Sequence, residues 1–278
     1  MKPPLVVFAF NRPNKLRETL GAIRRQTIQP PRIIAFVDGQ RFEAEHDAVE
    51  DCVNQLHKMP NSTVYWREKN YGCAHNIMRG LDQVVSEYSE FLVLEDDVVP
   101  AEGWYEALSS MLKHYEHNPK VATVGSFPTV LRNKLADYPY DVFMTPRFSC
   151  WGWGSTSLKF KEIIECWKRY IVNDTGDLTH VTDSTGIDIV NMLKSDPDRR
   201  LWDAVVAAAM MSRGQVQAVT KTFMSTNIGA DLHLEYHQNL LFTLNSTLES
   251  KIPAAYPESV DVQDDIRATI AQYINHQW

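Results

Sequence analysis

The sequence lacks the features by which several large classes of protein are recognised. Only four of its 278 residues are cysteines and no two form a CxxC pair, so neither a structural zinc site nor a disulfide framework is indicated. The 28 lysine and arginine residues are outnumbered by 35 acidic ones, which leaves a net charge of -7 and no basic stripe for nucleic-acid phosphates. We therefore expect reduced cysteines, a cytoplasmic location and no nucleic-acid partner.

Two further absences concern membranes and nucleotide sites. No apolar stretch approaches the roughly 20 residues of a spanning helix, so we expect no transmembrane segment, and any attachment to the inner face of the membrane would be peripheral. No GxGxxG motif follows the first apolar run, and GxxxxGK[ST] occurs nowhere. Both a Rossmann dinucleotide site and a P-loop are therefore disfavoured.

An apolar run that ends in three consecutive acids organises the chain. Phe91–Leu94 is followed directly by Glu95, Asp96 and Asp97, and Pro100 is expected to end the strand. Three carboxylates at the end of a buried strand repel one another and lose hydration unless a cation lies among them. Hard divalent cations prefer oxygen ligands and commonly bind substrate phosphates as well. The competing interpretation, a charged turn in water, rarely follows so apolar a run.

Strands and helices alternate around this run. Apolar stretches of strand length occur at Leu5–Phe10, Arg32–Val37, Thr63–Trp66, Val121–Val124, Val142–Met144 and Val216–Thr220. Segments with helical spacing begin at Pro13, at Glu43, after Gly72, and at about Glu102, Leu158 and Trp202. This order predicts an α/β fold with a mostly parallel, twisted sheet and helices on both faces.

Polar residues follow several of the predicted strands. Asn11–Arg12, Asp38, Asn70 and Glu95–Asp97 all come directly after an apolar run. Since ligands bind outside the carboxyl ends of such strands, we expect these side chains to converge on one crevice. Taken singly, Arg12 is no more than a surface arginine and Asp38 part of a turn.

Three later segments carry further candidates. Phe148–Gly154 contains two tryptophans separated by glycines, and an exposed indole offers a flat face to a sugar or base; a core aromatic cluster is the alternative. Trp202-Asp203 opens a helix, where Asp203 is either a base or only a helix cap. Ser225–Asp231 is expected to be a loop leading to His233 and His237.

Taken together, these segments resemble a known group. Ala9–Pro13, Asp38, Glu95–Asp97, Trp151–Gly154 and Trp202-Asp203 resemble, in order and spacing, the GT-A-fold glycosyltransferases related to N-acetylglucosaminyltransferase I, and more closely the bacterial ones encoded among polysaccharide genes. The resemblance implies a single GT-A domain over residues 1–250, with a nucleotide-binding half (1–126) and an acceptor and catalytic half (127–250). A tail over residues 251–278, with a short helix, would follow.

The resemblance implies a metal-dependent, inverting glycosyltransferase that moves a sugar from a nucleotide-sugar to an acceptor hydroxyl. The donor is expected to be a UDP-sugar, the acceptor a glycan or lipid-linked sugar in polysaccharide synthesis, and the cofactor Mn²⁺ or Mg²⁺. The residues implied at the donor are Asn11, Arg12, Asp38, His75, Asn76, Glu95, Asp96, Trp153 and Trp202. Asp97 would bind the metal, and Asp203 would be the general base. Apart from the resemblance, His237, with His233 as its competitor, is a candidate either for a contact with the diphosphate or for a metal ligand.

The chemistry suits these residue types. A divalent cation stabilises the charge that grows on a leaving phosphate, and a carboxylate base beside the attacking hydroxyl contributes about 10²- to 10⁴-fold. Two other functions compete. A nucleotidyltransferase usually carries a glycine- and lysine-rich phosphate loop, which Phe10–Pro13 does not supply. A non-catalytic sugar-binding protein on the same fold has no need of a base.

Overall fold

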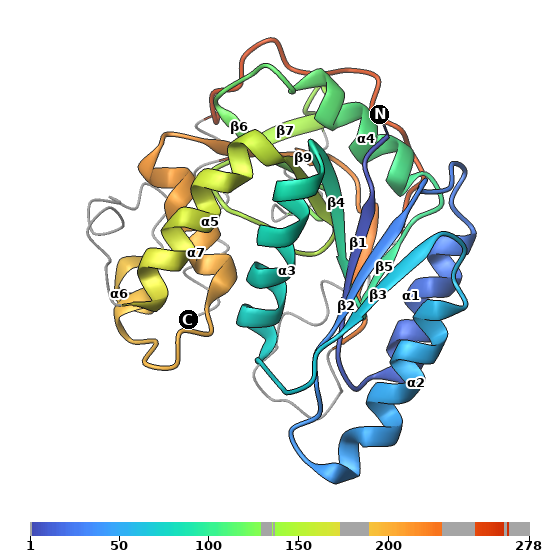
Figure 1. Cartoon of the computed structure of the whole chain (residues 1–278). Helices are drawn as coiled ribbons and strands as arrows, with labels where there is room; N and C mark the ends of the chain where they lie inside the picture. Colours follow the sequence, from blue (N-terminus) through green and yellow to red (C-terminus); the bar gives the residue numbers. More distant parts are fainter. Residues whose placement is uncertain are drawn as a thin grey trace.

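A mixed sheet with helices on both faces forms the body of the molecule (Figure 1). The computed structural model describes residues 2–128, 135, 137–172, 189–229, 248–263 and 266. Within them the sheet has eight strands in the order β3-β2-β1-β4-β8-β6-β9-β7. They are β1 (Leu5–Ala9), β2 (Ile33–Val37), β3 (Ser62–Trp66), β4 (Glu90–Glu95), β6 (Val121–Gly125), β7 (Val142–Thr145), β8 (Trp153–Thr156) and β9 (Val216–Thr220).

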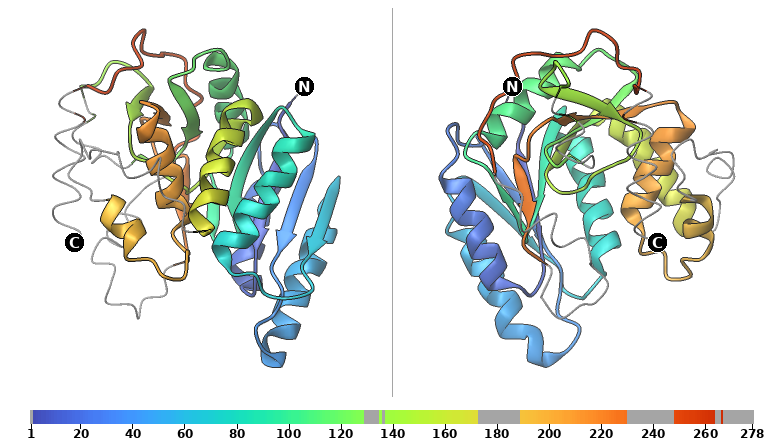
Figure 2. Two further views of the ribbon diagram at one scale, coloured as in Figure 1. Left: turned by 60° about the vertical axis from the view of Figure 1, so that its left-hand side comes forward. Right: turned by 180° about the vertical axis from the view of Figure 1, so that it is seen from behind.

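Two hydrophobic cores, one on each face, hold the helices to the sheet. Figure 2 shows the helices on both faces. One face carries α1 (Pro13–Arg24), α2 (His46–His57) and α4 (Trp104–His114), with the short η1 (Glu43–Glu45) before α2. The other carries α3 (Cys73–Glu87), α5 (Ser157–Ile171), α6 (Ile189–Lys194) and α7 (Trp202–Ser212). The predicted α/β fold, a mostly parallel sheet flanked by helices, is confirmed.

The sequence explains why β1 and α1 form where they do. All five residues of β1 are buried, as expected of a strand covered on both faces. Pro13 occupies the first turn of α1, where its missing N–H costs nothing, and Leu16, Leu20 and Ile23 then bury one side of the helix. Arg12 lies between the two elements, so its position follows from the strand end and the helix start together.

The chain reverses direction across the sheet between β1 and β4. It runs outward from β1 through β2 to β3, crosses back by way of α3, and places β4 parallel to β1 on the other side. Helices α1 and α2 lie on one face and α3 on the opposite face, so this is a topological switch point. A crevice opens there between the loops that follow β1 and β4.

Strand β8 corrects one expectation. Two interpretations of Trp153 were open, an indole exposed to the donor and a core aromatic cluster, and the structure supports the second: Trp153 lies in an antiparallel strand between β4 and β6 and is 0% exposed. Its ring packs against Phe91 at 5.8 Å and Phe148 at 5.0 Å between centroids. A Cβ atom on Gly154 would lie 2.4 Å from Leu92 Cδ2, so the glycine serves close strand packing. Trp153 is therefore a core residue, and its assignment to the donor is wrong.

A two-stranded sheet corrects two boundaries. The strand was expected to end at Pro100, but β4 ends at Glu95 and Pro100 belongs to a separate strand, β5 (Val98–Pro100). Part of the expected loop after Ser225 is a strand, β10 (Ser225–Asn227), which pairs antiparallel with β5. This pairing brings a segment from late in the chain against the turn that carries the acids.

A buried hydroxyl network fixes the backbone before β8. Gly152 has a φ of 82°, in the left-handed region, and a Cβ atom there would lie 2.6 Å from Ser126 Oγ. Ser126 Oγ donates to the Gly152 carbonyl at 2.7 Å and accepts from Trp104 Nε1 at 2.8 Å. Only glycine fits at this position without displacing the network.

Replacing Gly152 by alanine is therefore expected to lower the free energy of unfolding by about 2–4 kcal/mol, from backbone strain and crowding together. Gly214→Ala is the matched control, because Gly214 also has a positive φ, 61°, but no atom lies within 4 Å of its Cβ position. Chemical denaturation of both variants measures the difference. Equal losses would show that crowding at Gly152 contributes nothing.

Residues 251–263 of the tail run along the body without helix or strand. Asp141 accepts hydrogen bonds from the backbone N–H groups of Ala254 (3.0 Å) and Ala255 (2.9 Å), and Tyr256 stacks on His114 at 4.0 Å. Most of the segment expected to form a helix, Asp261–Trp278, lies outside the described residues.

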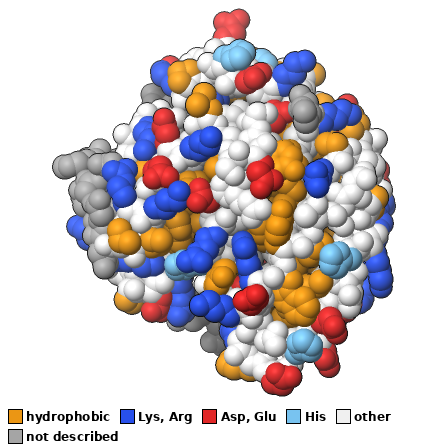
Figure 3. Space-filling view, viewed as in Figure 1, with side chains coloured by type: hydrophobic (Ala, Val, Ile, Leu, Met, Phe, Trp, Pro, Cys, Tyr) orange, Lys and Arg blue, Asp and Glu red, His pale blue; other side chains and the backbone are white. Residues whose placement is uncertain are grey.

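Among the helices that are described, none is long and apolar enough to cross a membrane. Figure 3 shows basic and acidic side chains interspersed on one face.

Candidate active site

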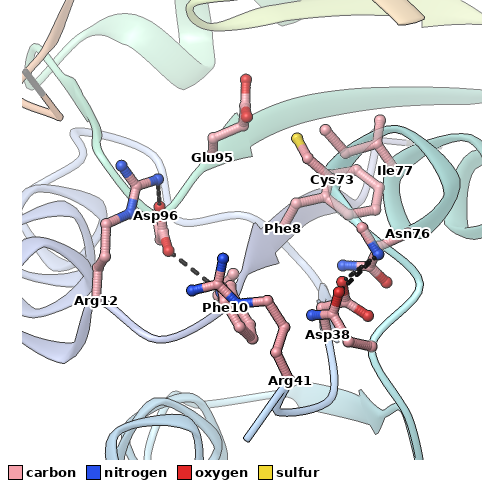
Figure 4. A pocket seen from close by; sticks show the side chains of 13 residues that line it. Phe8, Phe10, Arg12, Asp38, Arg41, Cys73, Asn76, Ile77, Glu95 and Asp96 are labelled. Atoms are coloured by element: carbon pink, nitrogen blue, oxygen red, sulfur yellow. Dashed lines mark hydrogen bonds and ion pairs between the residues drawn. The ribbon is translucent and has the colours of Figure 1, made fainter. Parts of the chain in front are cut away.

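Arg12 contacts two of the three acids at the switch point, Asp96 and Asp97. Figure 4 shows its contact with Asp96. Its Nη1 donates to Asp97 Oδ2 at 2.8 Å, and its Nη2 donates to Asp96 Oδ1. The loop after β1 thus meets the loop after β4, as the parallel pairing of these strands predicts. The guanidinium neutralises part of the repulsion between two adjacent carboxylates.

Both aspartates are buried, at 2% exposure for Asp96 and 6% for Asp97. The backbone N–H of Phe10 donates to Asp96 Oδ2 at 3.2 Å, and Thr19 Oγ1 donates to the Asp96 carbonyl at 2.9 Å. Burial raises the pKa of Asp96 to about 6, although Arg12 acts in the opposite sense. Burial alone would lower the pKa of Arg12, but the two aspartates together raise it. The surface-turn interpretation of these acids is therefore wrong.

Backbone from the end of β10 covers Asp97. The Ile228 N–H donates to the Asp97 carbonyl at 2.8 Å, and Lys15 Nζ donates to the Ile228 carbonyl at 2.7 Å. A Cβ atom on Gly229 would lie 1.9 Å from Asp97 Oδ2, so only glycine allows this approach. No local pattern in the sequence indicates this contact, because it depends on a strand pairing between residues more than 100 positions apart.

A pocket of about 260 Å³ opens beside the acids, at the carboxyl ends of β1, β2 and β4. It is lined by Phe8, Ala9, Phe10, Arg12, Asp38, Arg41, Asn70, Gly72, Cys73, Asn76, Ile77, Glu95 and Asp96. Five of the residues predicted at the donor are among them, namely Arg12, Asp38, Asn76, Glu95 and Asp96. The expected convergence of polar residues from separate strands is confirmed for Arg12, Asp38, Asn70, Glu95 and Asp96, whereas Asn11 and Asp97 do not line this pocket.

Asp38 holds the loop that precedes α3. Its Oδ1 accepts from the N–H groups of Gly39 (3.1 Å) and Tyr71 (2.8 Å), and its Oδ2 accepts from Gly72 N–H at 2.9 Å. Burial raises the pKa of Asp38, while these bonds act against the rise. Its visible role is thus to shape one wall of the pocket, and a contact with nucleotide stays a prediction.

Removing the Asp38 carboxylate with alanine is expected to destabilise the protein by about 2–4 kcal/mol, since buried N–H groups lose their acceptor. Amide hydrogen exchange at Tyr71 and Gly72 should accelerate with it. Asp47→Ala, on the exposed side of α2, is the control and should change neither quantity. Unchanged exchange in the Asp38 variant would show that the loop holds itself.

Asn76 lies in the pocket wall, whereas two further predicted donor residues, His75 and Asn11, do not line this pocket. Asn76 donates from Nδ2 to the Phe36 carbonyl (3.3 Å) and accepts from Arg67 Nε (3.2 Å) at the pocket wall. His75, one residue earlier, is not among the residues that line this pocket, and its ring meets Trp167 edge-on at 5.5 Å. Burial lowers the pKa of His75. Asn11, also outside this lining, donates from Nδ2 to Glu45 Oε1 at 2.9 Å.

The charges of Glu95 and Asp203 influence the pKa values of the same neighbouring groups. The pKa of Glu95 rises to about 8, first because of burial and then because of the charges of Asp97, Asp96 and Asp203. The charges of Glu95 and Asp203 also both raise the pKa of Cys150, on the loop before β8. The charge of Asp203 therefore reaches Glu95, which lines the pocket, although Asp203 itself is not among the residues of that lining.

Asp203 is the second residue of α7 and keeps contact with solvent. Loss of hydration against the surrounding protein nevertheless raises the pKa of Asp203. Two contacts act against this rise, namely the Ala204 N–H, which donates to Oδ1 at 3.0 Å, and the charge of Arg147. The residue at the N-cap is Leu201, without a side-chain cap bond. The helix-cap interpretation of Asp203 is therefore wrong, and its carboxylate stays accessible.

Trp202 corrects a second aromatic assignment. It is only 6% exposed and packs against Phe148 at 5.9 Å and Trp153 at 6.4 Å. The indole anchors the start of α7 in the core, and no open face is left for a donor sugar. The small apolar residues after Asp203 indicate from the sequence alone that this helix is buried. They do not indicate in which direction the side chain of Trp202 points.

The acidic pair suits a hard cation in its donor set. Asp96 and Asp97 offer carboxylate oxygens, and Arg12 already places positive charge against both. Within the part of the chain that the structure describes, no group of three or more His, Cys, Asp or Glu side chains is arranged to hold a metal. A metal here would need oxygen atoms from water or substrate. His233 and His237 lie outside the described residues.

The sequence identifies the family. Residues 5–174 match the model described as Glycosyl transferase family 2, which spans more than half of the chain. The chain therefore belongs to glycosyl transferase family 2. It is also similar to a glucosyl-dolichyl phosphate glucuronosyltransferase of Haloferax volcanii, with 26% identity over 141 residues, which is 50% of this chain and 41% of that protein. The chain thus spans less than half the length of this curated relative.

Two solved structures are similar at a lower level. One is the mannosyltransferase PcManGT from Pyrobaculum calidifontis in complex with GDP-Man and Mn²⁺, at 15% identity and a TM-score of 0.39, over 59% of this chain and 46% of that one. The other is S. aureus TarS 1–349 in complex with UDP-GlcNAc, at 15% identity and a TM-score of 0.35, over 46% and 35%. The family assignment rests on the sequence match, and the narrower resemblance to N-acetylglucosaminyltransferase I stays a prediction.

Proposed function

We propose that this chain is a metal-dependent, inverting glycosyltransferase that moves a sugar from a nucleotide-sugar to an acceptor hydroxyl. The observation that carries the proposal is the meeting of Arg12, Asp96 and Asp97 at the switch point, with Glu95 coupled electrostatically to Asp203. Family membership supports the same class of reaction. The donor side corresponds to residues 1–126 and the acceptor side to residues 127–250.

The donor would occupy the pocket beside β1 and β4. Asp38 and Asn76 form the wall where the base would bind, and Asp96 lies where a carboxylate can accept from the ribose hydroxyls. Arg12 lines the same pocket and can engage phosphate oxygens, because its side chain is 42% exposed. Glu95 lines the same pocket and is influenced by the charge of Asp203, and we assign to it a contact with the transferred sugar.

Asp203 would accept the proton of the attacking hydroxyl. The acceptor oxygen attacks the anomeric carbon, the bond to the diphosphate breaks, and the proton passes to the Asp203 carboxylate. Because the incoming oxygen approaches opposite the leaving diphosphate, the configuration inverts. Asp203 lies on a helix of the second half and Glu95 on a strand of the first, so the base and the donor groups approach the reacting carbon from different elements.

Asp97 would hold Mn²⁺ or Mg²⁺, with oxygens of the diphosphate completing the coordination. When bound, such an ion stabilises the charge on the leaving diphosphate. We further infer that the donor carries UDP and that the acceptor is a glycan or lipid-linked sugar, at the inner face of the membrane. The Haloferax relative, whose name gives a dolichyl phosphate sugar as its substrate, supports a lipid-linked acceptor.

A thermal-shift screen of nucleotide-sugars tests the proposal. A ligand that binds only the folded protein at 100 times its Kd adds about 2.7 kcal/mol to the free energy of unfolding, which is easily measured. We expect a UDP-sugar to raise the melting temperature in Mn²⁺ and much less in EDTA, and NMR of the product to show inversion. A nucleotide-sugar that binds equally well in EDTA would contradict the metal requirement.

A further inference from the structure

Arg12 occupies the place where the proposed cation charge would be needed. Its guanidinium contacts both Asp96 and Asp97, one nitrogen to each carboxylate. The two aspartates are adjacent and buried, so without a positive charge they would repel each other in a region poor in water. Arg12 thus supplies, from the chain itself, the neutralisation that a divalent ion would supply.

The surroundings of Asp97 leave little room for two cations. Backbone at Gly229 lies against Asp97 Oδ2, the same oxygen that accepts from Arg12 Nη1. A Cβ atom on Gly229 would also lie 3.0 Å from that nitrogen, so the glycine approaches both partners of the ion pair. A divalent ion bound at this oxygen would therefore stand against the guanidinium, and two positive charges at such a distance repel strongly.

Arg12 is the partner that can move. Its side chain is 42% exposed, whereas the side chains of Asp96 and Asp97 are 3% and 9% exposed. Asp96 would keep a hydrogen bond from Phe10 N–H after the guanidinium has left. Arg12 also lines the donor pocket, so a diphosphate bound there would offer it new anionic partners (Figure 4).

We propose that Arg12 holds the cation position in the donor-free protein and competes with the divalent ion for Asp97. The inference rests on the metal requirement of the proposed function. It follows that the metal binds weakly to the protein alone and tightly together with a nucleoside diphosphate, because the diphosphate both supplies ligands and draws Arg12 away. Arg12 is then a positioning residue that determines the order in which the metal and the nucleoside diphosphate bind.

Mn²⁺ binding measured by EPR, with and without UDP, tests this directly, because free Mn²⁺ gives the signal and no turnover is needed. Without nucleotide, Arg12→Gln should bind Mn²⁺ at least about 10-fold more tightly than the wild type, since a neighbouring positive charge is gone. Arg17→Gln, on the helix that begins directly after Arg12, is the matched control; Arg17 is exposed and pairs with Asp51, and its loss should change nothing. Adding Asp97→Asn to Arg12→Gln should remove the gain.

Arg12→Lys provides a second variant should the glutamine variant fail to fold. A lysine keeps the charge but cannot contact two carboxylates with a planar fork, so Mn²⁺ affinity should lie between those of the wild type and Arg12→Gln. A melting temperature that Mn²⁺ raises in Arg12→Gln but not in the wild type would be a further confirmation.

The outcomes separate this inference from the proposed function. If the wild type binds Mn²⁺ with UDP but neither Arg12 variant binds Mn²⁺ alone more tightly, the competition is wrong and the proposed function stands. If Arg12→Gln gains Mn²⁺ affinity but UDP never promotes binding to the wild type, the competition stands and the metal-dependent function is wrong. If Mn²⁺ binds in neither case, both are overturned.

Discussion

Asparagine in place of Asp203 is expected to lower kcat by about 10²- to 10⁴-fold, the contribution of a positioned general base. Asparagine has nearly the same shape and can still accept from Ala204 N–H, so α7 should remain intact. The donor pocket lies on other elements, and the Kd for the nucleotide-sugar should therefore change little. Steady-state kinetics together with a binding titration separate these two quantities.

The pH profile gives a second test of the same residue. Surrounding protein raises the pKa of Asp203, so its carboxylate is protonated at a pH where an ordinary aspartate is ionised. A base must be ionised to accept a proton, and kcat should therefore fall as the pH drops through this raised pKa. The fall should be absent from the residual activity of Asp203→Asn. Asp198→Asn, at an exposed ion pair with Arg200, is the control and should keep both the rate and the profile. Full turnover in Asp203→Asn would show that the general base is another residue.

Asparagine at Asp97 is expected to abolish the dependence of donor binding on Mn²⁺. Even an outer partner of a metal site is typically worth about 10- to 100-fold in affinity, and Asp97 is proposed to contact the metal itself. Isothermal titration of UDP with and without Mn²⁺ measures the change. Since Asp97 also pairs with Arg12, a melting curve must accompany the titration to show that the variant is folded.

Asp51→Asn is a suitable control for Asp97→Asn, because it removes one carboxylate from an exposed pair with Arg17. It should leave the effect of Mn²⁺ on UDP binding unchanged. If Asp97→Asn binds UDP with undiminished dependence on Mn²⁺, the metal ligand is a different residue. Asp96 would then be the next to test, since Arg12 contacts both aspartates.

The sequence predicted what depends on neighbours along the chain. The first four sheet strands and the helices between them were found because apolar runs of strand length alternate with helical spacing, and Pro13 marks the start of α1. The meeting of Arg12 with the acids followed from the rule that carboxyl ends of parallel strands share one edge. These parts of the site can therefore be predicted from the local sequence pattern and from the sheet topology.

What the sequence could not show depends on partners far away. Strand β8 is short, and its sequence is typical of a glycine-rich loop. It forms a strand because it pairs with β4 and β6, not because its own residues favour a strand. The same reason hides β10, and with it the cover that Gly229 places over Asp97. Whether Trp153 faced a ligand or the core was undecidable from glycine spacing alone.

The buried position of Trp153 links the two halves of the proposed reaction. Its ring touches Phe91, on the strand that ends in Glu95, and Trp202, the residue before Asp203. The strand that ends in Glu95 and the helix that begins at Trp202 are therefore held against each other by three aromatic side chains in edge-on and tilted contact, which supports the proposed arrangement of sugar contact and base. A smaller residue at Trp153 would let strand and helix drift relative to each other, so that catalysis could be lost through core packing while every reacting group is still present.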